Sequence, residues 1–304
     1  MSDPSQPTPP RLLAIGLGEV LWDLLPSGKQ LGGAPTNFAF HAQQLGARGI
    51  VISAVGRDAL GAEIEARLSD LQLSACLHHS NLPTGTVSVR LDAAGVPSYV
   101  IHQPVAWDEL SADAATLSHA AAADVVCFGS LAQRSTPSRA AIHAFLAATR
   151  RDACLRIFDI NLRQNFYSES IIRESLDVAG VLKLNDQELP VVAELLRLQT
   201  DEPGFAAALF RHFPSLRLVA LTRGPSGSAL FARDATSQRP GIATTLADTV
   251  GAGDAFTATL AIGLLRGLPL DHINAAANHV AAYVCSQHGA TPKLPAALLE
   301  MLST

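Results

Sequence analysis

A glycine-rich turn near residue 250 holds the residue types best suited to chemistry. It reads Asp248-Thr249-Val250-Gly251-Ala252-Gly253-Asp254 and precedes an apolar, helix-compatible run, Thr257 to Leu265. Gly251 and Gly253 allow a tight turn, and the first N–H groups of a helix lack partners within it, so they form an anion site. Asp254 lies in that site, where it could take a proton from an acceptor while the N–H groups neutralise a moving phosphoryl group. The plainer alternative is a first-turn acid that merely stabilises the helix.

A second polar group consists of Asp23 and Asn37, which flank the glycine pair Gly32-Gly33. It follows an apolar run, residues 12–17, that fits a buried central strand. In a doubly wound sheet, ligands bind near the carboxyl ends of strands. Asp and Asn supply the acceptors and amide donors that a polyol needs. The alternative makes Asp23 a turn residue and Asn37 the N-cap of a helix that ends at Leu45.

Three more polar clusters stand just past apolar, strand-like runs: Asp159 to Arg163, Asn185 to Glu188 and Thr222 to Gly227. In the first, Arg163 could clamp a phosphoryl or sugar oxygen with its planar fork, or could pair with Asp159 on a loop. The second cluster, an Asn followed three residues later by a Glu, fits a helix N-cap box. The third has glycines that allow a nucleotide to approach and a cation, Arg223, although a hairpin turn explains the glycines equally well.

The elements that would position these clusters alternate between strand and helix. Apolar runs at 50–56, 125–129, 155–159, 181–185 and 216–222 predict strands, and helices are expected at 137–150, 169–178, 187–196 and 271–287. This order predicts an α/β fold with a mostly parallel central sheet covered by helices on both faces.

One part of the chain has a different pattern of apolar and polar residues. Residues 86–91 alternate between apolar and polar, residues 98–101 return, and Asp92-Ala93-Ala94-Gly95 between them is a hairpin signal. An antiparallel piece of this kind does not belong in a parallel sheet buried on both faces. The segments at about 20–32 and 84–104 are therefore expected to form a small discontinuous β lid that excludes water. The whole would be one domain, 11–304, after a disordered tail, 1–10.

The composition narrows the class of protein. The chain has 304 residues, 48% of them hydrophobic, and a net charge of −5, which suits a folded globule without a basic surface for nucleic acid or an anionic membrane. No apolar run reaches the roughly 18 residues of a membrane span. The four cysteines have no Cys-x-x-Cys spacing and read as reduced thiols, so a cytoplasmic protein is expected. No Gly-x-Gly-x-x-Gly follows the first strand, which argues against a dinucleotide enzyme.

Two separated motifs resemble the signatures of the ribokinase-like (PfkB) carbohydrate kinases. The stretch Asp248 to Phe256 is similar to the C-terminal signature, and Gly32-Gly33-Ala34-Pro35-Thr36-Asn37 with Leu45-Gly46-Ala47 is similar to the N-terminal one. The resemblance runs from about Leu12 to about Pro292. It implies a ribokinase-like three-layer α/β/α fold, phosphorylation of a sugar hydroxyl by ATP with Mg²⁺, and a lid that often pairs subunits, hence a homodimer.

The resemblance also implies roles for individual residues. Asp254 would be the general base, with Gly251, Ala252 and Gly253 forming the anion hole around the transferred group. The sugar would be bound by Asp23, Gly32, Gly33, Asn37, Asp159 and Arg163. The nucleotide would be bound by Asn185, Glu188, Thr222, Gly224, Gly227 and Asn278, with Glu188 acting on Mg²⁺ through water. Asp248 would hold a monovalent cation such as K⁺.

The preferred acceptor implied by the resemblance is fructose. Bacterial fructokinases of the family share segments similar to Ala106-Trp107-Asp108 and to Asp159 to Arg163, although Trp107 is expected to pack at the lid hinge. Ribose, 2-keto-3-deoxygluconate or a nucleoside remain alternative acceptors, and a sugar-binding regulator without catalysis is an alternative of another class. The helix N-terminus is expected to favour ionised Asp254 and so to weaken it as a base, which a loose phosphoryl transition state tolerates.

Overall fold

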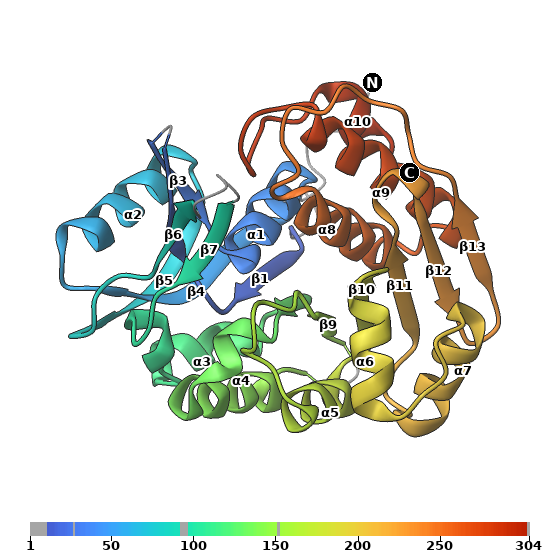
Figure 1. The fold of residues 1–304 in the computed structure, drawn as a ribbon, viewed down its shortest axis with the longest axis horizontal. Coiled ribbons are helices and arrows are strands. Elements are labelled where there is room, and N and C mark those ends of the chain that lie inside the picture. The colour runs from blue at the N-terminus through green and yellow to red at the C-terminus, as the bar shows by residue number, and fades with distance from the viewer. Residues whose placement is uncertain (1–10, 27, 92–96, 151–152, 303–304) are drawn as a thin grey trace, which may run out of the picture.

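A computed structural model of the chain describes residues 11–302 except 27, 92–96 and 151–152. The expected tail, residues 1–10, and the expected hairpin turn at 92–95 lie outside the described residues. In the described part, nine strands form the main sheet in the order β13-β12-β11-β10-β9-β8-β1-β4-β5 (Figure 1). The strands of this sheet are β1 (Leu13–Leu17), β4 (Arg48–Gly56), β5 (Ser74–Ser80), β8 (Val125–Phe128), β9 (Leu155–Asp159), β10 (Val181–Asn185), β11 (Leu218–Thr222), β12 (Ser228–Ala232) and β13 (Thr236–Arg239).

The strands from β5 to β11 across this sheet are parallel, and β12 and β13 complete one edge in antiparallel orientation. Their apolar runs are buried on both faces, as expected of parallel strands covered by helices. The register pairs Asn185 with Thr222 at the ends of β10 and β11, and Leu17 with both Ile52 and Phe128. Polar residues that follow these strands therefore gather along one edge of the sheet.

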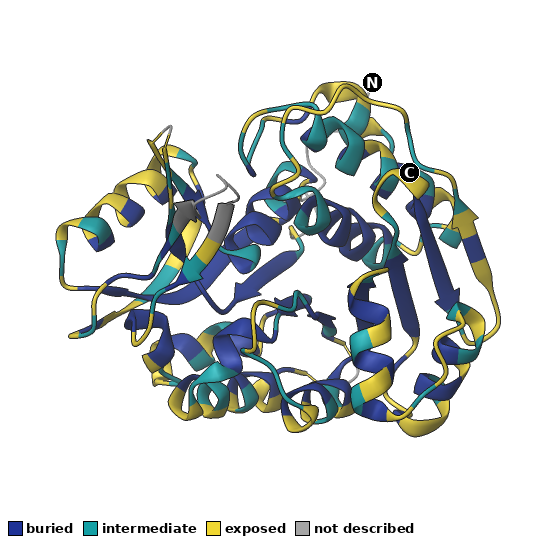
Figure 2. Cartoon of the chain, viewed as in Figure 1, coloured by how far each residue is buried: buried dark blue, intermediate teal, exposed yellow. Residues whose placement is uncertain are grey.

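Helices cover both faces of the main sheet and make a three-layer α/β/α structure (Figure 1). On one face α1, α8 and α9 pack together, and α4, α5, α6 and α7 cover the other. The helices are α1 (Ala34–Gln44), α2 (Ala59–Asp70), α3 (Ala114–Ala120), α4 (Thr136–Ala148), α5 (Glu169–Val178), α6 (Glu188–Leu196), α7 (Glu202–His212), α8 (Ala252–Leu265), α9 (Leu270–Cys285) and α10 (Ala296–Glu300). Figure 2 shows α8 enclosed on nearly all sides, with residues 255–263 buried.

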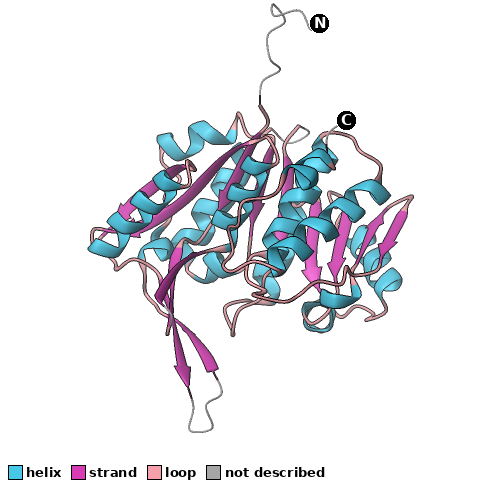
Figure 3. Ribbon diagram, turned by 90° about the horizontal axis from the view of Figure 1, so that it is seen from above, coloured by secondary structure: helices cyan, strands magenta, loops and turns pink. Residues whose placement is uncertain are grey.

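A smaller sheet combines the two segments expected to form a lid, at about 20–32 and 84–104, and is called the lid sheet below. It has the order β3-β2-β6-β7 within the described residues, and it projects from the body of the molecule (Figure 3). Its strands are β2 (Leu21–Leu25), β3 (Gly28–Gly32), β6 (Thr86–Leu91) and β7 (Pro97–Ile101). Trp107 lies near its base, fully buried, with the Arg134 guanidinium 3.8 Å from its ring centroid. This agrees with packing at the hinge rather than contact with a ligand.

Several elements do not stand out in the sequence. The edge strand β5 carries the exposed pair His78-His79, which breaks the apolar run expected of a strand in this sheet. Helix α7 contains Pro203 and Gly204 in its first turn, but Asp201 caps it by accepting a hydrogen bond from the Gly204 N–H. In the described part of the chain, no helix is both long and apolar enough to cross a membrane. All four cysteines are free thiols.

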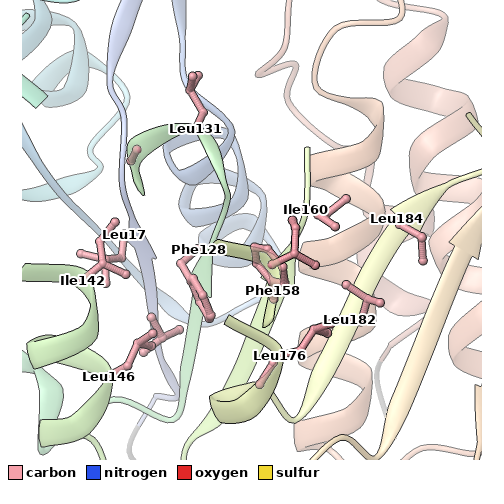
Figure 4. Close-up of a cluster of buried hydrophobic side chains, with 14 of the residues drawn as sticks. Leu17, Phe128, Leu131, Ile142, Leu146, Phe158, Ile160, Leu176, Leu182 and Leu184 are labelled. Carbon is pink, nitrogen blue, oxygen red and sulfur yellow. The ribbon is translucent and has the colours of Figure 1, made fainter. Parts of the chain in front are cut away.

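The larger hydrophobic cluster lies between the main sheet and the helix layer α4 to α7 (Figure 4). It packs these helices against strands whose ends carry the polar residues. The rings of Phe128 and Phe158 stack within it, with centroids 5.3 Å apart. Phe158 is fully buried and immediately precedes Asp159, so the position of that acid depends on how well this ring is packed.

We expect Phe158→Ala to lower the free energy of unfolding by about 3–5 kcal/mol, because truncation loses buried apolar surface and leaves a cavity. The measurement is denaturant unfolding monitored by circular dichroism. Phe210→Ala is the matched control, since Phe210 is only half-buried at the margin of the same cluster and should cost less. Equal losses in the two variants would contradict this description of the core.

Candidate active site

The glycine-rich turn opens helix α8 as expected. Gly251 is the N-cap, with φ of 79°, a left-handed conformation that glycine adopts without strain. A Cβ there would lie 2.6 Å from the Ala290 carbonyl oxygen, so a side chain has no room either. Within the described residues, the N–H groups of Gly253 and Asp254 have no backbone acceptor, and Ala252 makes only a long contact of 3.5 Å to Thr249. The turn therefore presents free donors to an anion.

Asn37 and Asp254 meet directly, although 217 residues separate them. The Asn37 side-chain amide donates to the Asp254 carboxylate over 2.8 Å. The interpretation of Asn37 as a helix N-cap is wrong, because α1 begins at Ala34 behind Gly33, whose φ of 111° sets the chain direction. Asn37 lies one turn inside the helix, with its own N–H bonded to the Gly33 carbonyl. Its side chain is thus free to reach α8.

The environment of Asp254 makes it a stronger base than an ordinary aspartate. Burial raises its pKa to about 6, and the charge of Asp159 adds to that effect. The amide of Asn37 and the positive charges of Lys183 and Arg163 oppose the rise. The expectation that the helix N-terminus would leave Asp254 a weak base is wrong in direction, since burial outweighs it.

Two further acids share this electrostatic environment. Glu19, just after β1, is buried with one carboxylate oxygen unpartnered, and burial with the nearby charge of Asp254 raises its pKa to about 7. Asp23 on β2 is half-buried, and burial raises its pKa to about 6. Arg163 acts on Glu19, Asp23 and Asp254 alike, lowering the pKa of each. One cation therefore acts on both the sugar-side acid and the base-side acid named from the sequence.

Close packing at both positions explains the pair Gly32-Gly33. A Cβ on Gly32 would lie 2.3 Å from an Asp23 carboxylate oxygen. A Cβ on Gly33 would lie 2.4 Å from the Glu19 carbonyl oxygen. Gly32 therefore lets a side chain lie close to the backbone, and Gly33 lets two backbone segments lie close together, where any larger residue would clash.

Asp159 lies beneath the site rather than in it. Its two carboxylate oxygens are taken by the Lys183 ammonium, at 3.0 Å, and by the Thr257 hydroxyl, at 2.7 Å. The alternative that Arg163 pairs with Asp159 is wrong, because Lys183 is that partner. The exposed Arg163 guanidinium instead donates to the Leu162 carbonyl. Direct contact of Asp159 with a sugar has no support in this geometry.

The nucleotide-side cluster at 185–188 forms a reciprocal cap. The Asn185 side chain accepts from the N–H groups of Gln187 and Glu188, and Glu188 accepts from the Asn185 N–H. The other Glu188 oxygen accepts from the Leu162 N–H. The hydrogen bonds of an N-cap box are therefore present, although α6 itself begins at Glu188 with Gln187 as its N-cap. Because both oxygens are engaged, Glu188 fits contact with a metal through water better than direct ligation.

The loop at 222–227 is a hairpin between β11 and β12, in which Thr222 pairs with Ser228. Gly224 has φ of 51° with open space where a Cβ would stand, whereas a Cβ on Gly227 would lie 2.1 Å from the Arg239 carbonyl oxygen. Arg223 pairs with Glu202, so it does not leave the loop cationic. The hairpin interpretation is confirmed, and the open side of Gly224 leaves room for a ligand.

Asn278 and Asp248 tie the late segments together. The Asn278 amide donates to the Ser228 hydroxyl, which links α9 to β12. The Asp248 carboxylate accepts from the N–H groups of Val250 and Gly289. The Cys285 carbonyl accepts the N–H groups of Ala247 and Asp248. These bonds hold residues 247–250 against residues 285–289, beside the anion site.

Three residues that lie in or beneath the site were not among those named from the sequence: Glu19, Lys183 and Thr257. Lys183 carried a signal, since a lysine inside an otherwise apolar strand must find a partner when both faces are buried. Glu19 follows Gly18 at the end of the first strand, where function collects. Thr257 gave no signal, because threonine is unremarkable inside a helix.

The fold and this site define a phosphotransferase with an alcohol acceptor. Residues 27–297 match the family described as pfkB family carbohydrate kinase, and the chain belongs to that family of sugar kinases. A fructokinase of Klebsiella pneumoniae is 31% identical over 291 residues, covering 91% of this chain and 92% of that protein.

Solved structures match along nearly the whole chain. The structure of an uncharacterized sugar kinase from Pyrococcus horikoshii in complex with ATP is 28% identical with a TM-score of 0.78, covering 92% of this chain and 94% of that one. The structure of a fructokinase from Vibrio cholerae with fructose, ADP and calcium ion bound is 27% identical with a TM-score of 0.76, covering 96% and 99%. The ribokinase-like fold is thereby confirmed.

The raised pKa of Asp254 predicts a pH-dependent stability effect. A carboxyl in the unfolded chain loses its proton near pH 4, whereas Asp254 holds its proton to about pH 6, so the ionised form destabilises the folded protein at neutral pH. Asp254→Asn cannot ionise. It should therefore raise the free energy of unfolding by about 1–3 kcal/mol at pH 7.5 and by less at pH 4.

Asp58→Asn is the control of opposite sign. Burial opposes ionisation of Asp58, but hydrogen bonds from Thr84 and from the Gly61 N–H outweigh it and hold its pKa below the usual value. This variant should lose stability at pH 7.5 and lose less as the pH falls. Denaturant midpoints at the two pH values check both variants, and a pH-independent difference for Asp254→Asn would contradict the assignment.

Proposed function

We propose that this sugar kinase is a fructokinase, which transfers the terminal phosphoryl group of ATP to a hydroxyl of fructose. The observation that carries the proposal is the hydrogen bond between Asn37 and Asp254. It joins the polar group near Gly32-Gly33, suited to a polyol, to a carboxylate among free N–H donors. A sugar hydroxyl held by Asp23 and Asn37 would lie within reach of Asp254.

Each part of the turn has a distinct role in this proposal. Asp254, with a pKa of about 6, is mostly ionised at neutral pH and accepts the proton of the sugar hydroxyl. The N–H groups of Ala252, Gly253 and Asp254 stabilise negative charge on the transferred group. Arg163 neutralises the surrounding acids, and Gly251 permits the turn. A loose transition state makes this electrostatic positioning more important than strong prior deprotonation.

The nucleotide fits the edge formed by the ends of β10 and β11. We assign its binding to Asn185, Glu188, Thr222, Gly224, Gly227 and Asn278, with support from the open side of Gly224. Mg²⁺, held through water near Glu188, would neutralise phosphate charge. A monovalent cation near Asp248 is part of the proposal, and it must share that carboxylate with two N–H donors. A cytoplasmic location, where thiols stay reduced, completes it.

Fructose is preferred because fructokinases of two organisms match along nearly the whole chain. The Ala106-Trp107-Asp108 segment adds little, since Trp107 is buried against Arg134. Ribose, 2-keto-3-deoxygluconate and a nucleoside are the competing acceptors. A non-catalytic sugar-binding regulator is disfavoured by Asp254, whose raised pKa suits a working base.

Release of ADP, measured with fructose, ribose, 2-keto-3-deoxygluconate and a nucleoside in parallel, tests the proposal. We expect the highest kcat/KM with fructose, and a higher value with any other acceptor would overturn the choice of substrate. Asp254→Asn should lower kcat by about 10²–10⁴-fold with little change in either KM, because it removes the base and leaves the binding groups. Sugar binding by the wild type without ADP release would favour the regulator.

We further propose that the lid sheet closes over the sugar and pairs two copies of the chain. It projects from the body of the molecule (Figure 3). The large apolar side chains of Leu24 and Tyr99 in this sheet are exposed. Exposed apolar side chains on a projecting sheet suit a contact between subunits. Sedimentation should give a dimer at micromolar protein, and Tyr99→Asp with Leu24→Asp should shift it toward monomer. A wild-type monomer at that concentration would contradict the pairing.

A further inference from the structure

Lys183 is a charged side chain in a strand that is buried on both faces. It stands in β10 between Leu182 and Leu184, both fully buried, and is itself only 6% exposed. Burial alone would drive an ammonium toward its neutral form, but the charges of Asp159, Glu188 and Asp254 outweigh that effect and raise its pKa. The strand therefore carries a fixed positive charge under the site.

The ammonium is connected to Thr257 of α8 through two hydrogen bonds. It donates to Asp159 over 3.0 Å, and the other Asp159 oxygen accepts from the Thr257 hydroxyl over 2.7 Å. That hydroxyl also lies 3.0 Å from the Gly253 carbonyl oxygen. The three side chains come from β10, β9 and α8, so the connection fixes the helix start relative to two strands.

The ammonium also lies directly against the anion-binding turn. A Cβ on Gly253 would stand 3.0 Å from the Lys183 Nζ atom and 3.9 Å from its Cε atom. Glycine at 253 thus gives the ammonium its space, in addition to any role in bending the backbone. A positive charge on the inner side of the turn adds to the field of the N–H groups that point outward.

We propose that Lys183 is a positioning residue for phosphoryl transfer: held by Asp159, it braces the turn at Gly253 and strengthens its anion site. The inference rests on the proposed kinase function. The charged groups facing Asp254 from the surrounding elements are Glu19, Asp159, Arg163 and Lys183. Of these, Lys183 alone contacts both an acid of the network and the turn.

The competing description is an ion pair that serves only the core. Arg134 and Asp108 form such a pair, buried to the same degree, with side chains 4% and 8% exposed against 8% and 4% for Lys183 and Asp159. That pair bonds the His102 carbonyl and packs on Trp107, away from the turn. Burial and pairing do not distinguish the two roles, whereas contact with Gly253 does.

The test compares Lys183→Met with the double variant Lys183→Met, Asp159→Asn. The single variant leaves a buried carboxylate without its partner and should lose stability. The double variant removes both charges, so it should recover most of that stability, as measured by denaturant unfolding. We expect kcat to stay about 10²-fold below wild type in both, with KM for sugar and ATP within roughly threefold of wild type, because the turn is misplaced. A kcat that recovers together with stability in the double variant would overturn the proposal.

Two threonines of α8 supply a matched pair of variants that should both fold. Thr257 and Thr259 are both fully buried, and each hydroxyl lies near the carbonyl four residues earlier, but only Thr257 also bonds Asp159. Thr257→Val should lower kcat roughly tenfold, and Thr259→Val should leave it within about twofold. Equal effects in the two variants would also overturn the proposal.

The wild type separates the two possible failures. If the wild-type protein releases no ADP with any sugar, the proposed function fails before any variant is made. If the wild type is active and Lys183→Met, Asp159→Asn keeps a wild-type kcat, only the role of Lys183 fails. A pH profile of kcat/KM for Asp159→Asn adds an independent readout, because loss of that acid should move the acidic limb to lower pH.

Discussion

The contact between Asn37 and Asp254 is the interaction on which the site depends. It requires α1 and α8 to pack side by side on one face of the sheet, and it requires α1 to lie close against β1, where glycine makes room for the helix backbone. Gly16, for example, stands where a Cβ would lie 1.9 Å from the Pro35 carbonyl oxygen. The polar contact is short because apolar packing has already brought the helices together. In the proposed mechanism, sugar binding and proton transfer thus share one rigid support.

Electrostatic balance is the second requirement. Asp254 is repelled by Glu19 and Asp159, and Asp23 by Asp248, when these acids are ionised, and burial raises the pKa of Glu19, Asp23 and Asp254. Lys183 below and Arg163 above offset part of that charge. In the proposed mechanism, this balance leaves Asp254 strong enough to act as a base and leaves the turn able to accept a phosphate. Without these two cations, the negative charge of the acids would weaken the attraction between the free N–H groups of the turn and an anion.

Much of the fold could be predicted from the sequence because the local patterns are strong. Buried apolar runs located β1, β4 and β8 to β11, and helix α5 has the predicted bounds, Glu169–Val178. Strands β6 and β7 of the lid sheet were predictable, because residues 86–91 alternate between apolar and polar, unlike the runs of the main sheet. The start of α1 was not, because Pro35 and the positive φ of Gly33 begin the helix three residues before the attractive cap at Asn37.

The site was predictable as a set of residues but not as a network. Lys183 pairs with Asp159 because β10 lies beside β9, and strand order is a property of the whole sheet. The direction of the Asp254 pKa shift depends on burial by helices and strands distant in sequence, which outweighs the local effect of the helix terminus. Local motifs name the acids, whereas tertiary packing decides their partners and their strength.

The attachment of the C-terminal segment to α1 has a consequence for biosynthesis. His41 bonds the Ala290 carbonyl, and Gln44 bonds both Pro292 and Leu294. Helix α1 therefore cannot complete its contacts until residues 290–294 have been synthesised. Ala290 also lies against Gly251. A ribosome-bound chain that lacks these last residues cannot complete the site, and contacts of such large sequence separation form slowly. The kinase would therefore stay inactive until residues 290–294 have been synthesised and have docked on α1.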